Sequence, residues 1–373
     1  FLFRYPIQKG CVGMTIKDIA KQCGVSISTV SRVLNKRPDV SPSVRERVFA
    51  VVESCGYIPN DSARDLVRSH SDAIGVVTRG TGNLFFSEVL KAISREIDRA
   101  GYTMVLRQIT TDADEVMTGA MLEREKKLQG LIFLGGRFDY TPDVMSRIVV
   151  PYVCCSYSSV FGSLDPASYA SIAIDDHDTA CRAVSHLISL GHRNIAALIS
   201  SPDDRSISEL RYRGYLDALS ASGIPFAPEL LACTNGRFDL ESAYAAATAL
   251  IDSGADFSAI FALSDIFGIA AMKALHDRGR RVPEDCSVIA IDGLDVSAYT
   301  IPTLTTLIQP AATMGQESVA LLLDMLENGS PARHLRPKAI LREGSSVQCI
   351  PENLHDPVLH PDGVEKSFQS RSV

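Results

Sequence analysis

Short apolar runs that alternate with amphipathic stretches constrain the fold of this chain more than any other feature. The runs lie between residues 73 and 291 and are rich in β-branched and aliphatic side chains. Alternation of strand-like and helix-like segments predicts parallel sheets with helices on both faces. The predicted strands are Ala73–Val77, Thr103–Leu106, Leu131–Leu134, Tyr152–Cys154, Ser171–Ile174, Ile195–Ile199, Leu230–Cys233, Ala259–Leu263 and Ser287–Ile291.

So many strands are expected to form two similar doubly wound lobes rather than one sheet. The chain is expected to pass between the lobes near Ile174–Asp176 and again near Pro302–Ile308. A third crossing near Arg336–Ile340 would place the last strand back in the first lobe. The expected divisions are 72–174 with 308–336 for lobe 1, 175–303 for lobe 2, and 72–343 for the whole α/β domain.

Helix start and stop signals between residues 15 and 56 predict a separate all-α module. Thr15 is a good N-cap with Asp18 in the first turn, and Gly24 can end that helix in the left-handed conformation. Ser26 caps a second helix, and Ser41 begins a third. Two short helices joined by a turn of about four residues form a helix-turn-helix. The expected apolar faces are Ile16, Ile19 and Ala20, then Val30, Val33 and Leu34, then Val44, Val48, Val51 and Val52.

The exposed face of the second helix suits a DNA groove, because it carries short hydrogen-bonding side chains and one arginine instead of Glu and Lys. Ile27 can contact a thymine methyl group, and Arg32 can bind guanine through two hydrogen bonds. Most of the other polar side chains suit phosphates. The alternative is a three-helix unit that docks on another protein. The predicted DNA contacts in this module (residues 14–57) are Thr15, Ser26, Ile27, Ser28, Thr29, Ser31, Arg32 and Asn35.

Residues 58–71 are predicted to form a hinge. Pro59 ends the helical module, and Asn60 can cap another helix that is too short to be stable alone in water. Contacts with DNA could fold this helix, and Leu66 would then be an apolar wedge in the minor groove that bends the duplex. The alternative is a plain linker with an exposed leucine.

The motifs of residues 15–66 resemble the headpiece and hinge of the lactose/galactose repressor (LacI/GalR) family. They read Thr15-Ile-Lys-Asp-Ile-Ala20, Gly24-Val-Ser26, Thr29-Val-Ser-Arg-Val-Leu-Asn35 and Gly56-Tyr-x-Pro-Asn60-x-x-Ala63-Arg64-x-Leu66. A looser similarity continues to about residue 343. The resemblance implies that Asn60, Ala63 and Leu66 of the hinge contact DNA.

The same resemblance implies a periplasmic-binding-protein-like sensor behind the headpiece. It implies a homodimer that represses transcription at a pseudo-palindromic operator, under allosteric control by a sugar-like metabolite. An effector-dependent activator and a two-lobed sugar-binding protein without a regulatory role remain alternatives. The chain departs from the family pattern twice, since Asn83-Leu84-Phe85 lacks a proline and Gly293 follows Asp292 where the family often has a second Asp.

Candidate effector contacts follow the predicted strands, because ligands of open parallel sheets bind beyond the carboxyl ends of the strands. Aromatic rings can stack on a sugar ring, and Asp or Arg can bond its hydroxyl groups. The resemblance supports Arg211, within Arg211-Tyr-Arg-Gly214-Tyr215, and Asp265. The aromatic pair Phe85 and Phe86 could equally be core. The candidates are Phe85, Phe86, Arg137, Arg205, Arg211, Phe238, Asp265 and Asp292, with Asn83, Tyr157 and Asp175 also following strands.

Charge is distributed unevenly along the chain. The net charge is −7, yet residues 14–71 hold nine Lys/Arg and six Asp/Glu. A basic N-terminal module attached to an acidic domain is expected when only the N-terminal module contacts DNA phosphates. The arginine content makes an acidic sugar or sugar phosphate conceivable as the effector. Residues 1–13 are expected to be an extension before a start at Met14, and residues 344–373 a polar tail.

Several other protein classes lack support in the sequence. No apolar stretch reaches the roughly 18–20 residues of a membrane span, and the cysteines show no disulfide or zinc spacing. A reducing cytoplasm is therefore expected, with no metal and no cofactor. An enzyme is disfavoured because the chain lacks the G-x-G-x-x-G, P-loop and G-x-S-x-G motifs. The cluster Asp175 to Asp178 could mimic a metal site, but the family resemblance implies a helix start there, and His192 is interpreted as structural.

Overall fold

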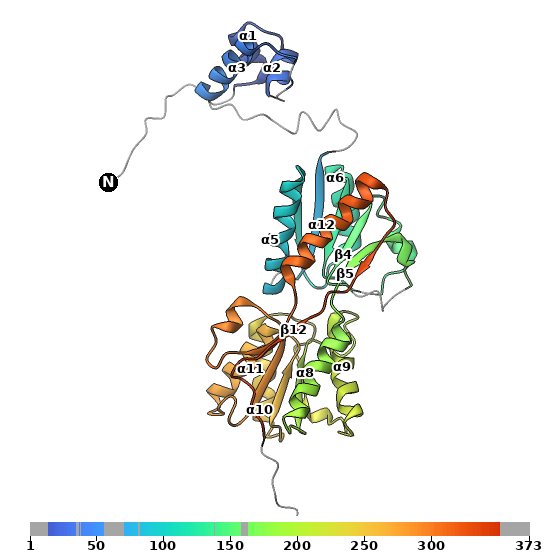
Figure 1. Ribbon diagram of the computed structural model, residues 1–373, viewed down its shortest axis with the longest axis vertical. Helices are drawn as coiled ribbons and strands as arrows, with labels where there is room; N and C mark the ends of the chain where they lie inside the picture. The colour runs from blue at the N-terminus through green and yellow to red at the C-terminus, as the bar shows by residue number, and fades with distance from the viewer. Residues whose placement is uncertain are drawn as a thin grey trace, which may run out of the picture. The chain divides into compact units, whose positions relative to one another are not determined.

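The computed structural model describes residues 14–34, 37, 39–55, 71–80, 83–137, 139–157 and 163–350. The chain divides into two compact units, residues 1–71 and 72–373 (Figure 1). No helix in the described ranges is long and apolar enough to cross a membrane.

The described residues of the first unit form three helices, α1 (Ile16–Cys23), α2 (Ile27–Leu34) and α3 (Pro42–Cys55). A capping box starts α1, since the Thr15 and Asp18 side chains each accept a backbone N–H of the other residue, and Gly24 ends the helix at φ 62°. The predicted helix-turn-helix is therefore present. Its core consists of Ile19, Ala20, Cys23, Val30, Val33 and Val48, with Ile16, Leu34, Val44, Val51 and Val52 half-buried around it.

Lobe 1 of the second unit is a six-stranded parallel sheet in the order β11-β5-β4-β3-β1-β2. Its strands are β1 (Ala73–Arg79), β2 (Thr103–Ile109), β3 (Gly130–Leu134), β4 (Tyr152–Cys155), β5 (Ala170–Ile172) and β11 (His334–Leu335). Its helices are α5 (Leu84–Arg99), α6 (Glu115–Lys126), the short α7 (Pro142–Met145), the 3₁₀ turn η1 (Pro166–Ser168) and α12 (Ala311–Asn328).

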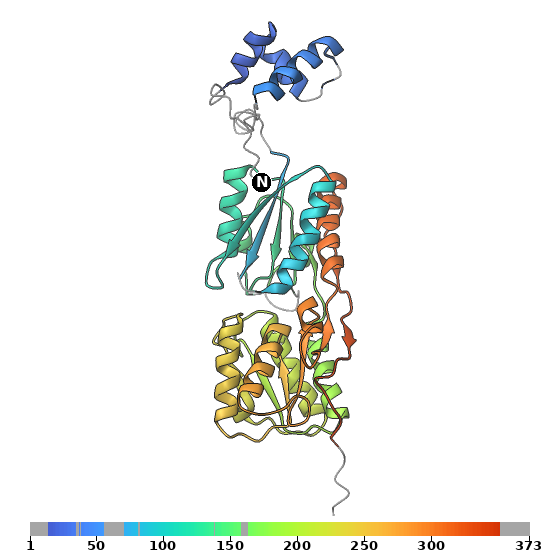
Figure 2. The same cartoon turned by 90° about the vertical axis from the view of Figure 1, so that its left-hand side faces the viewer.

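Helices cover both faces of the lobe 1 sheet, as the nearly continuous burial of β1, β3 and β4 requires. Figure 2 shows α5 and α12 on one side of the sheet and α6 on the other. A glycine lets α5 and α12 approach closely, because a Cβ at Gly315 would lie 2.6 Å from the Cβ of Ala92.

Lobe 2 repeats the design with the strand order β12-β10-β9-β8-β6-β7. Its strands are β6 (Ile195–Ile199), β7 (Leu231–Cys233), β8 (Ala259–Ala262), β9 (Ser287–Asp292), β10 (Thr305–Ile308) and β12 (Ile340–Arg342), of which β12 alone in this sheet runs antiparallel to its neighbour. Its helices are α8 (Asp176–Ser189), α9 (Ile207–Ala221), α10 (Leu240–Asp252) and α11 (Asp265–Asp277), with 3₁₀ turns η2 (Pro228–Leu230) and η3 (Asp295–Ala298).

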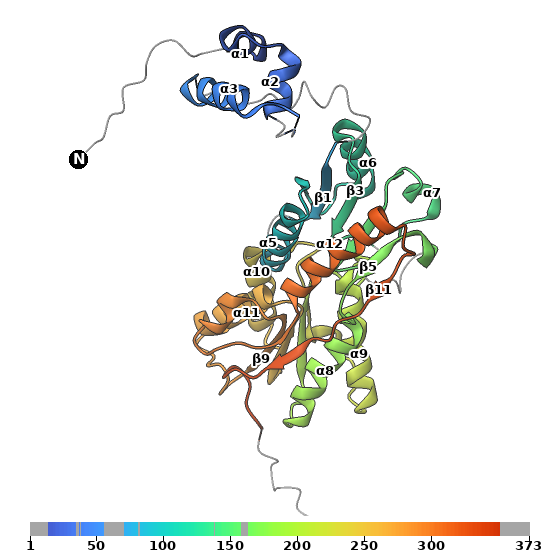
Figure 3. The same cartoon turned by 45° about the horizontal axis from the view of Figure 1, so that its top comes forward.

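The predicted position of the last strand is wrong. The chain returns to lobe 1 after β10, so that α12 and β11 belong there, and it then crosses back to form β12 in lobe 2 (Figure 3). Residues beyond β12 continue this packing and are not a polar tail as far as residue 350. Ser346 is fully buried, donates its hydroxyl to the carbonyl of Val288 and accepts the N–H of Thr305. The sequence analysis missed this packing because residues 344–350 are held by hydrogen bonds of polar side chains and show no apolar periodicity.

Candidate functional site

The outward face of α2 carries the side chains predicted to contact DNA. Ser26, Ile27, Ser28 and Arg32 are exposed, and Thr29 and Ser31 are half-buried. The Ser26 hydroxyl accepts the N–H of Thr29 at 3.1 Å and so caps the helix. Exposed short polar groups next to the apolar Ile27 give a surface that can reach base edges in the major groove.

Several of the predicted DNA contacts have local partners, and the Ser26 hydroxyl lies within hydrogen-bond distance of the hydroxyl groups of Ser28 and Thr29. The hydroxyl of Thr15 donates to Asp18 at 2.6 Å, as part of the cap of α1. Arg32 lies 3.5 Å from the Asp39 carboxylate, and both side chains are more than half exposed. An ion pair this exposed is weak, so DNA can displace it. Asn35, Asn60, Ala63 and Leu66 lie outside the described residues.

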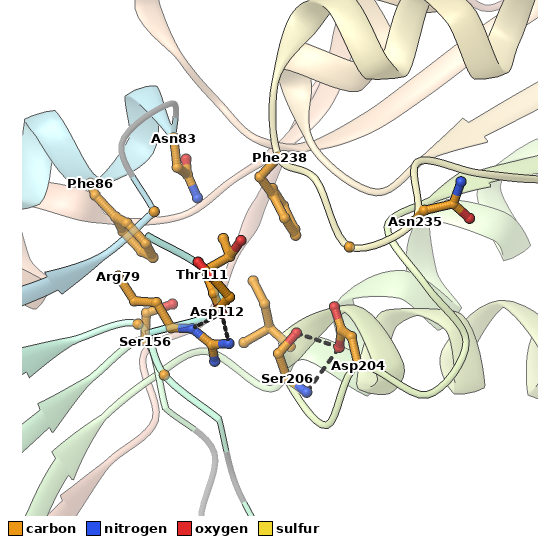
Figure 4. Close-up of a pocket in the computed structure, with 15 residues that line it drawn as sticks. Arg79, Asn83, Phe86, Thr111, Asp112, Ser156, Asp204, Ser206, Asn235 and Phe238 are labelled. Carbon is orange, nitrogen blue, oxygen red and sulfur yellow. Dashed lines mark hydrogen bonds between the residues drawn. The ribbon is translucent and has the colours of Figure 1, made fainter. Parts of the chain in front are cut away.

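A cavity of about 250 Å³ lies between the two lobes of the second unit, at the carboxyl ends of both sheets (Figure 4). This is where open parallel sheets bind ligands. Lobe 1 contributes Arg79, Gly80, Asn83, Phe86, Thr111, Asp112, Gly135, Gly136 and Ser156, and lobe 2 contributes Asp204, Ser206, Ile207, Asn235, Gly236 and Phe238.

Two of the predicted aromatic residues face each other across this cavity. Phe86 comes from the first turn of α5 and Phe238 from the loop after β7, and Figure 4 shows them on opposite sides. Phe86 can occupy its place because residue 135 is glycine, with φ 69°, where a Cβ would lie 2.6 Å from the Phe86 ring. Phe238 rests on the ring of Phe267, with centroids 5.3 Å apart. Phe85, by contrast, is 2% exposed and belongs to the core of lobe 1.

Arg79 is the cation in the described lobe 1 wall of the cavity, and all three of its guanidinium nitrogens have protein partners. Nε and Nη2 of Arg79 donate to the carbonyl of Thr111, and Nη1 lies 3.8 Å from the buried carboxylate of Glu115. Asn83 caps α5 by accepting the N–H of Phe85 at 3.0 Å, which leaves its amide nitrogen for other partners. A hydrogen bond from Thr110 lowers the pKa of Asp112, so this carboxyl group is ionised.

The lobe 2 wall is organised around Asp204. Its carboxylate accepts the N–H of Ser206 at 2.9 Å and the hydroxyl groups of Ser206 and Ser200. These three donors fix the orientation of the carboxylate. An ionised carboxylate has about four lone-pair positions, so Asp204 can still accept a hydrogen bond from a ligand hydroxyl group.

Arg211, which the sequence favoured as a ligand contact, does not line the cavity. It is 1% exposed, and its Nε donates to Asp176 at 2.8 Å. Nη1 donates to the carbonyl of Leu263 at 2.7 Å and lies 3.3 Å from Asp292. Asp292 is buried and also accepts Nε2 of Gln309 at 2.7 Å. Burial and the nearby Asp265 charge raise the pKa of Asp292 to about 7, although the guanidinium of Arg211 opposes this shift.

Asp265 also lies away from the cavity wall, at 0% exposure. Its carboxylate accepts the N–H of Leu294 at 2.7 Å, the hydroxyl of Ser297 at 2.6 Å and the hydroxyl of Thr306. These donors come from the loop after β9, from η3 and from β10. Asp265 therefore ties together the segments that lead into the second crossing between the lobes.

The remaining predicted arginines are paired near the surface and do not line the cavity. Arg137 donates to Asp139 at 2.7 Å, and its backbone N–H donates to Glu115. Arg205 lies 3.6 Å from Glu209. Tyr157 is buried beside Arg137 in a separate small pocket of lobe 1. Phe86 and Phe238 are thus the members of the predicted effector set that line the cavity, together with Asn83, which was also noted after a strand.

The residues at Asp175 to Asp178 point to different partners. Asp175 caps α8 by accepting the N–H of Asp178, Asp176 binds Arg211, and His177 pairs with Asp217 at 2.8 Å. No group of three or more His, Cys, Asp or Glu in the described ranges could hold a metal ion. His192 is buried, with Nδ1 bonded to Ser258 and Nε2 to the carbonyl of Gln348.

Sequence reasoning missed most polar residues of the cavity. Arg79 is the last residue of β1, Thr111 and Asp112 follow β2, and Asp204 and Ser206 follow β6. The strand-end rule would have found Thr111 and Asp112 if it had been applied to the second strand. Arg79 was missed because β1 runs two residues beyond the apolar segment Ala73–Val77.

Comparisons with known proteins agree with this arrangement. Residues 15–60 match the family described as bacterial regulatory proteins, lacI family, and residues 184–347 match the periplasmic binding protein-like domain. The regulator MalR of Clostridium butyricum is 38% identical over 324 residues, which cover 86% of this chain and 96% of MalR.

Two solved structures share the fold over 90% of the chain. The complex of the regulator CelR with cellobiose is 28% identical, with a TM-score of 0.65 and all of that chain covered. The lac repressor dimer bound to operator and the anti-inducer ONPF is 26% identical, with a TM-score of 0.73 and 99% of that chain covered.

Proposed function

Because the chain belongs to the lacI family of bacterial regulatory proteins, we propose that it represses transcription at an operator whose affinity is set by a small molecule held between its lobes. The observation that carries this proposal is the cavity, because both lobes contribute to its wall. A ligand that contacts both walls favours one arrangement of the lobes over others. It changes operator affinity by the difference in its own affinity for those arrangements.

The headpiece supplies the DNA-binding half of the proposal. The exposed Ser26, directly before α2, and Ile27, Ser28 and Arg32 of α2 are proposed to enter the major groove, and Asn60, Ala63 and Leu66 of the hinge are proposed to contact the minor groove. A single module of this size binds weakly, so two copies on a pseudo-palindrome are needed. Since operator DNA is inside the cell, we place the protein in the cytoplasm, as a regulator without enzymatic activity.

A second copy of the chain is proposed to cover an apolar surface of lobe 2. Tyr299 and Ile301, in the loop after η3, are 84% and 97% exposed, and Val296 of η3 is also exposed. Three large exposed apolar side chains within six residues favour an interaction surface, because contiguous apolar patches mark interaction sites. In a two-fold dimer the same surface of each subunit meets its counterpart, which gives the two headpieces the symmetry of a palindrome.

The effector is proposed to bind between Phe86 and Phe238, with hydrogen bonds to Asn83 and Asp204. A further ligand contact is proposed at the buried cluster of Arg211, Asp292 and Gln309. Nη2 of Arg211 and Oε1 of Gln309 are buried and have no hydrogen-bond partner among the described residues. A buried donor without a partner costs about 1–3 kcal/mol, so we propose that the arrangement of the lobes with ligand bound brings a ligand group to Nη2 of Arg211, which does not line the cavity in the present structure.

The proposal is tested by selecting operators from random duplex DNA with the purified full-length chain. A screen of sugars, sugar phosphates, sugar acids and nucleobases then identifies compounds that change the affinity for a selected duplex. We expect a palindromic consensus and at least one compound that shifts the affinity. A protein that binds all duplexes equally, with and without these compounds, would overturn the proposal.

Arg32→Ala is expected to weaken binding to the selected operator by about 10- to 100-fold for each half-site, because a two-bond arginine–guanine contact contributes roughly 1–3 kcal/mol of base discrimination. Binding to a scrambled duplex should fall only slightly, through the loss of one charge. Fluorescence anisotropy with both duplexes measures the difference. Arg99→Ala on α5, which removes the same charge from an exposed ion pair of lobe 1, is the control. Equal losses on both duplexes would show that Arg32 reads no base.

Gly135→Ala is expected to weaken the effector response by about tenfold, because an added Cβ displaces the Phe86 ring and overpacking of this kind costs roughly 1–3 kcal/mol. Operator binding without effector should not change. The matched control is Gly223→Ala, since Gly223 also has a positive φ, of 67°, but nothing lies within 4 Å of the added Cβ. The effector concentration that gives half of the maximal change in operator affinity is measured for both variants. Identical values in the two variants would show that Phe86 does not contact the effector.

A further inference from the structure

A carboxylate lies beside the arginine that is proposed to bind guanine. Oδ2 of Asp39, in the turn before α3, is 3.5 Å from Nη1 of Arg32, and the side chains of Asp39 and Arg32 are 56% and 61% exposed. When Arg32 binds a guanine in the proposed complex, the carboxylate of Asp39 loses this partner. It then lies at the surface that faces the DNA, where a charged group without a hydrogen-bond donor is costly.

The backbone on both sides of Asp39 is held in place. The N–H of Arg37 donates to the carbonyl of Arg32 at 3.0 Å, and Nη2 of Arg45, on α3, donates to the carbonyl of Arg37 at 2.8 Å. Val40 is half-buried and packs against the core of the headpiece. Contacts with α2, with α3 and with the core therefore keep the carboxylate of Asp39 close to the place where Arg32 is proposed to meet the DNA.

A carboxylate distinguishes between the bases, because it only accepts hydrogen bonds. In the major groove cytosine presents the N4 amino donor, whereas guanine presents the acceptors N7 and O6 and thymine presents the acceptor O4. Adenine presents an N6 amino donor next to the acceptor N7, and this acceptor repels a carboxylate. Cytosine therefore suits the carboxylate of Asp39 best, and guanine and thymine suit it least.

The short distance between the two side chains limits which cytosine can be read. A guanidinium bound to N7 and O6 of guanine occupies the edge of its own base pair, and the next base along the strand is about 3.4 Å away. We infer that Asp39 is a second base-reading residue, which selects a cytosine in a base pair adjoining the one that Arg32 binds. This inference rests on the proposed function, since it concerns the same DNA-binding surface.

The inference is tested by selecting duplexes from random DNA with the full-length wild-type chain and with three variants, Arg32→Ala, Asp39→Ala and Asp39→Asn. Arg32→Ala should lose the preference for guanine at one base pair of each half-site, which locates Arg32 on the operator. Asp39→Ala should lose the preference for cytosine at an adjoining pair. Asp39→Asn should change this preference from cytosine to adenine, because an amide both donates and accepts and can bind N6 and N7 of adenine together.

Fluorescence anisotropy with two duplexes, which carry cytosine or thymine at this position, measures the size of the effect. Wild type should bind the cytosine duplex at least about tenfold more tightly, which is the usual effect of one mismatched base pair. Asp39→Ala should bind the thymine duplex more tightly than wild type does, because the repulsion between the carboxylate and O4 of thymine is gone. A misfolded variant would bind every duplex more weakly, so loss of structure cannot produce this gain.

Glu53→Gln is the matched control, because it removes one carboxylate charge from the same headpiece. Glu53 is exposed and lies near the end of α3, about 16 Å along the helix from its first residue, Pro42. This variant should bind both duplexes slightly more tightly and keep the base preferences of wild type. If Asp39→Ala also kept those preferences, or gained affinity equally for both duplexes, the inference would be overturned.

Operator binding in the presence of candidate effectors separates this inference from the proposed function. If the wild-type chain selects a palindromic operator and a compound shifts its affinity, but Asp39→Ala selects the same bases, the proposed function stands and the inference fails. If cytosine is selected through Asp39 but no compound changes operator affinity, the inference stands and the proposed regulation fails.

Discussion

Replacing Arg211 with methionine is expected to lower the free energy of unfolding of the two-lobed unit by about 3–5 kcal/mol, because removing one partner leaves buried charges without compensation. Asp176 and Asp292 both lie within hydrogen-bond distance of the guanidinium and are less than 5% exposed. The carbonyl of Leu263 loses its donor as well. Urea unfolding of the full-length chain, followed by circular dichroism, measures the difference.

The control for this prediction is Arg137→Met, which makes the same chemical change in an exposed ion pair. The side chains of Arg137 and Asp139 are 47% and 33% exposed, so the expected loss is below about 1 kcal/mol. The effector response of Arg211→Met should also be lost, since Nη2 of Arg211 is proposed to meet the ligand. An Arg211→Met variant that unfolds like wild type would contradict the structural role.

Asp265→Ala is expected to destabilise the same unit by several kcal/mol, because each buried donor left without a partner costs about 1–3 kcal/mol. The carboxylate satisfies the N–H of Leu294 and the hydroxyl groups of Ser297 and Thr306, which are all buried. Hydrogen exchange should show the largest loss of protection in η3 and β10, because these segments depend on the carboxylate.

Asp277→Ala, on the same helix α11, is the matched control. Asp277 is exposed and bonds Lys273 and the hydroxyl of Tyr244, so its loss should cost less than about 1 kcal/mol. The resemblance implied that Asp265 holds the effector, and in the structure its carboxylate accepts hydrogen bonds from three protein donors. If the Asp265 variant were as stable as the Asp277 variant but ignored the effector, the carboxylate would belong to the ligand site.

Much of the fold could be predicted from local pattern, because buried parallel strands are nearly continuous apolar runs. The segment Ile195–Ile199 was predicted with the bounds that β6 has, and other predicted strands start or end within one or two residues. The short strands β11 and β12 carry no such pattern. His334–Leu335 and Ile340–Arg342 are strands because the neighbouring strands β5 and β10 offer backbone partners. A strand that forms because a sheet edge far away in the sequence offers backbone hydrogen bonds needs no periodic apolar pattern of its own.

The residues of the cavity were harder to predict than the fold. Strand-end reasoning found the right edge of each sheet, since it named Phe86 and Phe238, but it could not tell which polar side chain there faces the cavity. Arg211 looked like a ligand contact because it is an arginine in the right motif. The motif did not show that its charge is balanced by Asp176 and Asp292, which come from α8 and β9. Only the packing of these elements brings the three side chains together.

The amino-acid sequence by itself determined the features that depend on neighbouring residues: the capping box of Thr15 and Asp18, the helix end at Gly24, and the apolar strands of both sheets. These follow from hydrogen bonds and burial patterns within a few residues. Tertiary structure alone decided which lobe receives β12 and which charges remain available in the cavity. The position of β12 and the charges in the cavity depend on residues that are far apart in the chain. The net charge of a site is the sum of all charged side chains that folding brings to it.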